Sequence, residues 1–295
     1  MLSPIAIVEL TLAGLLLGGI YSLLSIGLTI TFGVARILNL AHGEFMMVSA
    51  LAVYLFFQFT GGTVNPFTSL AILTPILFVS GYLFERFLIR PLRRKPVEVL
   101  EWAPLLVTLG VALIIEDLAF IIVPREFGVP YSLPPTKILG LTLSTTRLTS
   151  LLLVTAVALG LTLFLRKTYT GKAIRASIQD REAALTMGIN VNRISAITFG
   201  LGVSLAAAAG VFLIMIRGLD AYVGLPITAK AVAIVILGGM GSIMGSLLGA
   251  IILGISEVYV SFYSPAWSFT VAWAILILIL LLRPQGLFGK RAERI

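Results

Sequence analysis

Six consecutive positions near the start of the chain bring together side chains that could do chemistry. Asn39 supplies an amide, His42 the one imidazole of the chain, Gly43 a flexible backbone position and Glu44 a carboxylate, and long apolar runs flank them on both sides. In hydrocarbon an unpaired backbone group costs several kcal/mol, so a helix breaks there only where protein or water satisfies the freed groups. Ionisable groups at such depth are expensive, which predicts that these four residues belong to a translocation pathway. The alternative is an ordinary interfacial loop, with Asn39 as a cap and His42 at headgroup level.

A second interruption lies in the other half of the chain. An apolar run enters Gly238-Gly239-Met240-Gly241-Ser242, Gly245 follows, and another apolar run begins. Paired interruptions in opposite halves point to a pathway at mid-membrane, which predicts that Gly238, Gly239 and Gly241 also belong to it. Because the two interruptions resemble each other only loosely, an internal repeat is one interpretation among others.

Small residues recur every four positions in three of the apolar runs. On a helix this spacing places them on one face, where they allow another backbone to approach closely. Packing is the interpretation we favour, although the same face would also permit helices to slide. The three series are Gly241, Gly245 and Gly249; Gly14 and Gly18; and Gly200, Ser204 and Ala208.

Four acidic residues stand inside apolar runs: Glu9, Glu116, Asp117 and Glu257. An intramembrane carboxylate can serve a proton relay in a secondary transporter. Nothing in the sequence pairs these four with a spaced series of further carboxylates or histidines. A structural role, in hydrogen bonds to a neighbouring helix or near the external end, is therefore the favoured interpretation.

The elements that must position these residues are membrane spans. Of the 295 residues 59% are hydrophobic and 12% are charged, and the mean hydropathy is +1.08, whereas soluble domains have about 25% charged residues. The absence of Cys and the single His exclude disulfides, thiolate metal sites and multi-imidazole sites. Gly171-Lys172 and Gly289-Lys290 lack the upstream glycine of a phosphate-binding loop. We therefore expect no catalytic residue, metal site or nucleotide site in this chain.

The positive charges predict the topology. Of the 21 basic residues, 15 fall in three segments, Arg86 to Lys95, Arg166 to Arg193 and Arg283 to Arg294, each at or between the ends of apolar runs. Basic residues in such short loops mark the cytoplasmic side, so the net charge of +8 indicates orientation and not nucleic-acid binding. The N-terminus and Glu126 to Thr146 then become external. No Lys or Arg precedes Arg36, so we expect no signal peptide.

Apolar runs of span length predict a single all-α, polytopic membrane domain over residues 1–295 with eight to nine membrane segments. Residues 228–263 must enter and return as a broken, re-entrant pair around Gly238 to Gly245. The remaining predicted spans are 6–32, 44–60, 67–89, 104–123, 147–165, 194–216 and 266–282.

The cytoplasmic segment Lys172 to Arg193 is long for a loop between two spans. Ile174, Ile178 and Leu185 recur at helical intervals, which predicts a short amphipathic helix outside the membrane. Its Glu182-Ala183-Ala184 stretch favours helix, and Gly188 suits a C-cap. Such a helix needs a partner, either the lipid surface or the groove of a soluble protein. The basic charge favours lipid, whereas Asp180 and Glu182 favour a protein groove.

At this point the chain resembles a known family. Glu182-Ala183-Ala184, three residues and Gly188 are similar to the EAA signature of bacterial ABC-importer permeases, where the segment forms the helix that couples to the ATPase. Asn39-Leu40-Ala41-His42-Gly43-Glu44 resembles the N-x-A-H-G-[DE] stretch of branched-chain amino-acid permeases, in which Asp is also common at the last position. Leu237 to Ser242 with Gly245, and Arg283 to Gly289, are similar to two further blocks of that family. The matches are collinear over nearly the whole chain.

The resemblance implies an ATP-driven importer of branched-chain amino acids, or of a related urea- or amide-type solute, in a bacterial or archaeal cytoplasmic membrane. Implied partners are a second, homologous permease subunit, two ATPase subunits that bind ATP and Mg²⁺, and a periplasmic or lipid-anchored solute-binding protein. Asp180, Glu182, Ala183, Ala184 and Gly188 then form the ATPase-coupling element. Two other classes stay open on the residues: a proton-coupled secondary transporter that uses His42, Glu116 or Asp117, and a channel with a glycine-lined filter.

Overall fold

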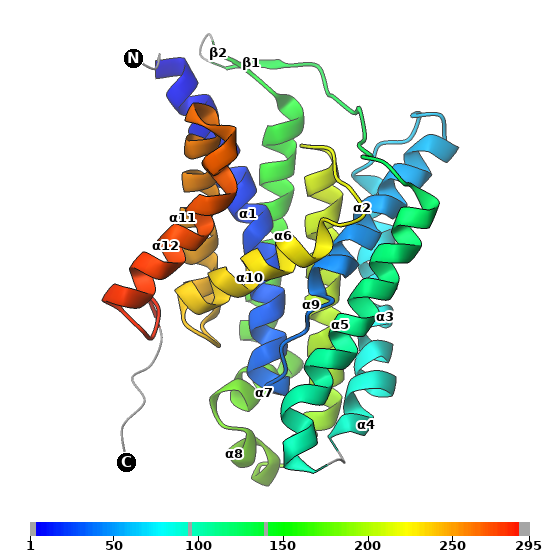
Figure 1. Cartoon of the computed structure of the whole chain (residues 1–295), viewed down its shortest axis with the longest axis vertical. Helices are drawn as coiled ribbons and strands as arrows, with labels where there is room; N and C mark the ends of the chain where they lie inside the picture. Colours follow the sequence, from blue (N-terminus) through cyan, green and yellow to red (C-terminus); the bar gives the residue numbers. More distant parts are fainter. Residues whose placement is uncertain (1–3, 94–95, 139–140, 289–295) are drawn as a thin grey trace.

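The computed structural model describes residues 4–93, 96–138 and 141–288, and helices dominate it (Figure 1). Within these residues seven helices are long and apolar enough to cross a membrane, and two shorter apolar helices accompany them, which confirms the predicted all-α, polytopic class. The elements are α1 (Pro4–Ala35), α2 (His42–Phe59), α3 (Thr68–Phe84), the π-helix η1 (Glu85–Ile89), α4 (Arg90–Leu92), α5 (Val97–Ile122), α6 (Thr145–Lys167), α7 (Tyr169–Gln179), α8 (Arg181–Thr186), α9 (Val191–Ile214), α10 (Gly224–Gly238), α11 (Ile243–Tyr263), the 3₁₀-helix η2 (Pro265–Trp267) and α12 (Ser268–Leu282), with a hairpin of β1 (Thr136–Ile138) and β2 (Leu141–Leu143).

Short polar residues define where several helices begin. The side chains of Ser144, Thr168, Asp180, Asn190 and Ser242 each accept a hydrogen bond from a backbone N–H of the following first turn. These N–H groups have no partner within the helix, so such caps fix the first residue of α6, α7, α8, α9 and α11.

Helices α1 and α9 form the centre of the molecule. Nearly all of α9 is buried, and it packs against α1, α2 and α3, while α1 also packs along α11. Small residues let these helices approach: Gly27 of α1 meets Gly202 of α9, and Gly18 of α1 meets Gly254 of α11. Gly14, Gly18 and Gly200 therefore serve helix packing, because an added Cβ at each would meet the backbone of a neighbouring helix.

The outer surface is apolar, as expected of helices that face lipid or another membrane subunit. Large exposed hydrophobic side chains follow the outward faces of α3, α5, α6 and α12, among them Ile76, Leu106, Ile121, Leu152, Leu159 and Leu281.

The loops and helix ends lie at the two ends of the molecule as the predicted topology requires (Figure 1). The start of α1, the β1–β2 hairpin and the loop between α2 and α3 lie at one end of the molecule, and α4, α7 and α8 lie at the other. Arg94, Lys95 and the basic residues from Lys290 onward lie outside the described residues.

The broken pair over 228–263 differs from the prediction in its proportions. Its second half, α11, is itself of span length, whereas α10 has 15 residues and is about 22 Å long at 1.5 Å per residue. Helix α10 crosses obliquely in front of α1 and α9 (Figure 1). Gly241 precedes α11 and lies in the turn, so it does not share a helix face with Gly245 and Gly249 as the spacing predicted.

Candidate translocation and coupling sites

The first interruption is buried inside the protein. Residues 36–41 connect α1 to α2, and Asn39, His42 and Glu44 are at most 1% exposed. Asn39 Oδ1 accepts a hydrogen bond from the backbone N–H of Ala41, 3.1 Å away, and so fixes the turn before α2. His42 Nε2 donates to the carbonyl oxygen of Leu24 in α1 at 3.0 Å. The segment is therefore braced against the central helix and lies away from the outer apolar surface.

Gly43 and Glu44 contact the beginning of α10. The backbone N–H of Gly43 donates to Thr228 Oγ1 at 2.7 Å, and a Cβ on Gly43 would overlap the Gly224 carbonyl. The Glu44 carboxyl lies directly against Gly224, the first residue of α10. The Glu44 carboxyl thus lies at the positive end of the α10 dipole, and among the described residues its two buried oxygens have no hydrogen-bond partner of standard geometry.

The second interruption is the turn that ends α10. Gly239 and Gly241 have φ values of 95° and 83°, a conformation that only glycine adopts without strain. Gly238 is buried against Gly245, and a Cβ on either would collide with the other's backbone. The turn therefore requires glycine both for its backbone conformation and for its packing.

The C-terminal tail covers this turn. The backbone N–H of Leu287 donates to the carbonyl of Leu237 at 2.8 Å, and that of Phe288 to Gly238 at 3.1 Å. The glycine turn and the C-terminal tail, two of the sequence blocks that resemble the family, therefore pack against each other. Gly289, the last residue of the tail block, lies outside the described residues.

The seven predicted pathway residues form two groups and not one site. Gly43 and Glu44 contact the beginning of α10, Asn39 and His42 lie beside them at the start of α2, and the three glycines lie at the end of α10. Helix α10 is the element that connects them. Whether either group touches a solute remains a prediction.

The predicted coupling segment consists of two helices, α7 and α8, because Asp180 leaves the helical conformation and caps the second one. Asp180 Oδ1 accepts hydrogen bonds from the N–H groups of Glu182 and Ala183 at 2.9 and 3.0 Å. Gly188 has φ +79°, and Ile189 N–H donates to the Ala184 carbonyl at 3.0 Å. The predicted C-cap at Gly188 is therefore confirmed.

The expected single apolar stripe is wrong for the same reason. Ile174 is buried and Ile178 packs on Gly33 of α1, but Leu185 follows the break and is 53% exposed. In α8, Ala184 faces inward, whereas Glu182, Ala183, Leu185 and Met187 are exposed. This face is exposed in the described part of the chain and is available to a partner.

A buried ionic cluster joins the region behind α8 to the spans. Glu85 in the π-helix η1 forms ion pairs with Arg90 at 3.2 Å and Arg93 at 3.1 Å. Arg93 also donates to Ser195 Oγ at 2.6 Å, and Arg90 to the Asn192 carbonyl at 3.0 Å. The start of α9, which directly follows α8 and its cap, is thus tied to the end of α3.

A second buried cluster contains a residue that sequence reasoning missed. Lys230 of α10 donates to Glu257 Oε1 of α11 at 2.7 Å and to the Tyr21 hydroxyl of α1 at 3.2 Å, and Tyr21 donates to Glu257 at 3.1 Å. The structural role expected for Glu257, in hydrogen bonds to neighbouring helices, is thereby confirmed. The available signal was a lone lysine in the apolar run of α10.

The other acidic residues of the apolar runs lie nearer the surface than Glu257. Glu9 and Asp117 are exposed, while Glu116 is half-buried on α5. Within the described part of the chain, no group of three His, Cys, Asp or Glu residues could hold a metal ion.

Comparisons with known proteins agree with these features. Residues 10–280 match the family model described as branched-chain amino acid transport system / permease component. The chain is 31% identical to the high-affinity branched-chain amino acid transport system permease protein BraD of Pseudomonas aeruginosa and 29% identical to LivH of Escherichia coli (strain K12), over 94% of each chain in both cases. It is 30% identical to the probable branched-chain amino acid transport permease protein LivH of Methanocaldococcus jannaschii, over 92% of this chain and 90% of that one. No solved structure matches.

Proposed function

Because this chain belongs to the family of permease components of branched-chain amino acid transport systems, we propose that it carries leucine, isoleucine and valine across the cytoplasmic membrane of a bacterium or archaeon. It is a transmembrane subunit of an ABC importer, and ATP and Mg²⁺ bind to the partner ATPases. The observation that carries the proposal is α8. This short, firmly capped helix lies beyond the spans at the same end as α4, and its outward face is exposed among the described residues.

Helix α8 is the coupling element in this proposal. Leu185 and Met187 supply the exposed apolar surface that a helix buries in a groove, and Glu182 supplies a charge beside it. Closure of the ATPases would move α8, and the movement would reach α9 through Gly188 to Asn190 and reach α3 through Arg93 and Glu85. A channel or a secondary transporter has no use for such a helix.

The remaining partners complete the importer. The chain is also 26% identical, over 91% of its length, to a permease named LivM of Escherichia coli (strain K12), which supports pairing with a related second permease subunit. A periplasmic or lipid-anchored binding protein would deliver the solute at the opposite end from α8.

The contact with the ATPase can be tested by crosslinking. The chain has no Cys, so Met187→Cys introduces a single thiol. In the assembled importer, a short bifunctional maleimide should join this thiol to a cysteine in the helical-domain groove of the ATPase. Thr63→Cys, exposed at the other end, is the matched control. Crosslinking at Thr63 but not at Met187 would overturn the proposal.

A further inference from the structure

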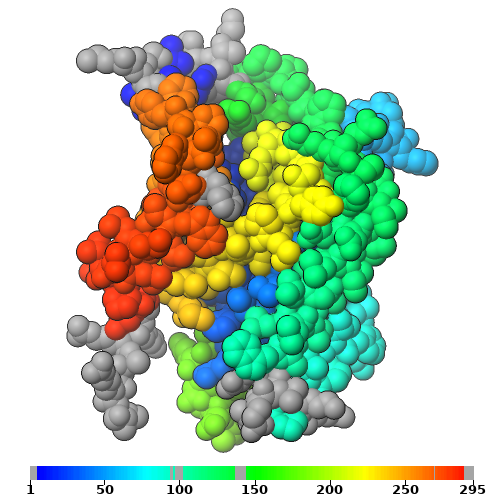
Figure 2. All heavy atoms as spheres, in the orientation of Figure 1, coloured from blue at the N-terminus to red at the C-terminus, as the bar shows by residue number. Residues whose placement is uncertain are grey.

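A cavity of about 370 Å³ opens at the end of the molecule that carries the N-terminus. It lies between α1, α6, α9, α11 and α12. Figure 2 shows the surface hollowed between the orange atoms of α11 and the yellow atoms that precede α10, with blue atoms of α1 at the bottom. Its volume is within the range of small-molecule sites. None of the predicted pathway or coupling residues lines it.

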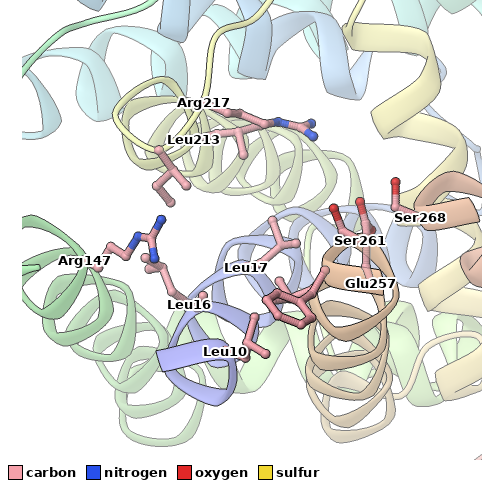
Figure 3. A pocket seen from close by; sticks show the side chains of 13 residues that line it. Leu10, Leu16, Leu17, Arg147, Leu213, Arg217, Glu257, Ser261 and Ser268 are labelled. Carbon is pink, nitrogen blue, oxygen red and sulfur yellow. The ribbon is translucent and has the colours of Figure 1, made fainter. Parts of the chain in front are cut away.

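The wall of the cavity is mostly apolar, with charged groups at separate places. Leu10, Leu16 and Leu17 of α1 and Leu213 of α9 supply the apolar part. Arg147 comes from the start of α6, and Glu257 and Ser261 of α11 lie across the cavity from it. Arg217, from the segment after α9, extends toward the side of Glu257 and Ser261 (Figure 3). An aliphatic surface with a few convergent polar groups is typical of a site for a small ligand.

The charges of the cavity leave an excess of two cations. Glu257 is neutralised by Lys230, 2.7 Å away. Arg147 and Arg217 line the same cavity, and the ion pairs found among the described residues involve neither of them. A guanidinium group favours a planar, two-oxygen anion such as a carboxylate.

Glu257, in contrast to the two arginines, favours a cationic group of the ligand. A carboxylate has about four acceptor positions, and this one accepts hydrogen bonds from Lys230 and Tyr21. Its side chain is 8% exposed and lines the cavity. A ligand with a cationic donor next to its anionic group could therefore use both walls at once.

We propose that this cavity binds a free aliphatic α-amino acid, with its carboxylate on Arg147 and Arg217 and its ammonium group on Glu257. The alkyl side chain lies on the leucines of α1. The inference rests on the proposed function, since it places an acceptor site for the transported solute where the binding protein would release it. A solute at Glu257 would also lie next to the ion pair of Glu257 with Lys230, which joins α11 to α10. Helix α10 is the one that connects the two interruptions.

The test is equilibrium binding of tritiated leucine to the importer in nanodiscs, assembled with its ATPases and partner permease but without the binding protein. Arg147→Gln and Arg217→Gln should each weaken leucine binding about tenfold or more, the effect of losing one charge-assisted hydrogen bond. Arg125→Gln, an exposed arginine at the same end that does not line the cavity, is the matched control and should leave binding unchanged. Leucinamide, which lacks the carboxylate, and isocaproate, which lacks the ammonium group, should each compete more weakly than leucine.

Three results would overturn the inference. The first is unchanged leucine binding in both arginine variants, and the second is no leucine binding by a complex that takes up leucine when the binding protein is added. The third is loss of co-purifying anionic lipid, and not of leucine, from the arginine variants, which would show that the cavity holds a lipid headgroup. Should Arg217→Gln not assemble, Arg217→Lys keeps the charge and should retain binding in part. Failure of the proposed function is distinct, because the complete wild-type importer would then show no ATP-dependent uptake.

Discussion

At the scale of single residues, Gly43 determines how closely α2 approaches α10. Its N–H donates to Thr228, and no space remains for a side chain between it and Gly224. Glu44 sits at the same contact, against the first turn of α10. Since a Cβ at Gly43 must push the two helices apart, the contact is sensitive to the smallest substitution.

Gly43→Ala should therefore impair the protein, whereas Gly110→Ala should not. Nothing lies within 4 Å of a Cβ at Gly110 in α5, and alanine there adds helix propensity of up to about 1 kcal/mol. Overpacking at Gly43 should cost about 1–3 kcal/mol. Thermal unfolding of the assembled importer in nanodiscs, together with uptake per complex, measures both effects. Equal behaviour of the two variants would show that α2 and α10 separate easily.

Lys230 and Glu257 make a second residue-scale prediction. Lys230→Met leaves the Glu257 carboxylate buried and unpaired, and breaking a buried pair costs about 3–5 kcal/mol. Lys230→Met combined with Glu257→Met removes both charges and should restore most of the stability. The thermal unfolding midpoints of the single and double variants measure whether stability is restored. A double variant as unstable as the single one would mean that the pair is not coupled in the membrane.

The sequence singled out Glu257 but not its partner. Lys230 is 27 positions away and on another helix, and only the crossing of α10 over α1 and α11 brings it next to Glu257 and Tyr21. The burial of Asn39, His42 and Glu44 was predictable, because polar groups between apolar runs have few other places to lie. The contact of Gly43 and Glu44 with the first turns of α10 depends on the path of that helix and was not predictable.

At the scale of elements, α8 is short and depends on its caps. Six residues cannot form a stable helix alone, so Asp180 at one end and Gly188 at the other fix its position. The sequence predicted the C-cap and the helix formers between them. It missed the break at Asp180, because the spacing of Ile174, Ile178 and Leu185 is the same whether or not one helix runs through them.

Glu182→Arg should uncouple the importer without unfolding it. The side chain is exposed and lies in the first turn of α8, so the reversed charge acts mainly on the partner surface. We expect leucine uptake to fall at least tenfold at normal complex yield, with ATP hydrolysis no longer stimulated by the loaded binding protein. Lys172→Glu, on α7 and also exposed, controls for a change of charge at the same end. Normal uptake in the Glu182→Arg importer would remove α8 from the coupling path.

At the scale of the whole molecule, most spans were predictable because an apolar run of span length has one stable place, the bilayer. The proportions of the broken pair were not, since composition does not distinguish the oblique, 15-residue α10 from half of a re-entrant loop. Nor did the sequence predict that the tail at Leu287 and Phe288 would close the turn at Gly238. That contact joins parts of the chain about 50 positions apart and depends on where α12 returns.

The topology can be tested with single cysteines, since the natural chain has none. Thr63→Cys should react with a membrane-impermeant maleimide added to intact spheroplasts. Leu185→Cys, also exposed but at the α8 end, should react only after the membrane is opened. Labelling of Leu185→Cys from outside would invert the orientation that the basic segments predict.

The most direct test of the central claim is uptake of tritiated leucine by proteoliposomes that contain the complete importer. ATP is supplied or withheld on the α8 face, and a proton ionophore is present or absent. We predict uptake that requires ATP, persists when the ionophore collapses the proton gradient, and disappears in the Glu182→Arg importer. Uptake that proceeds without ATP and follows the proton gradient would contradict the assignment of this chain as the permease of an ATP-driven importer.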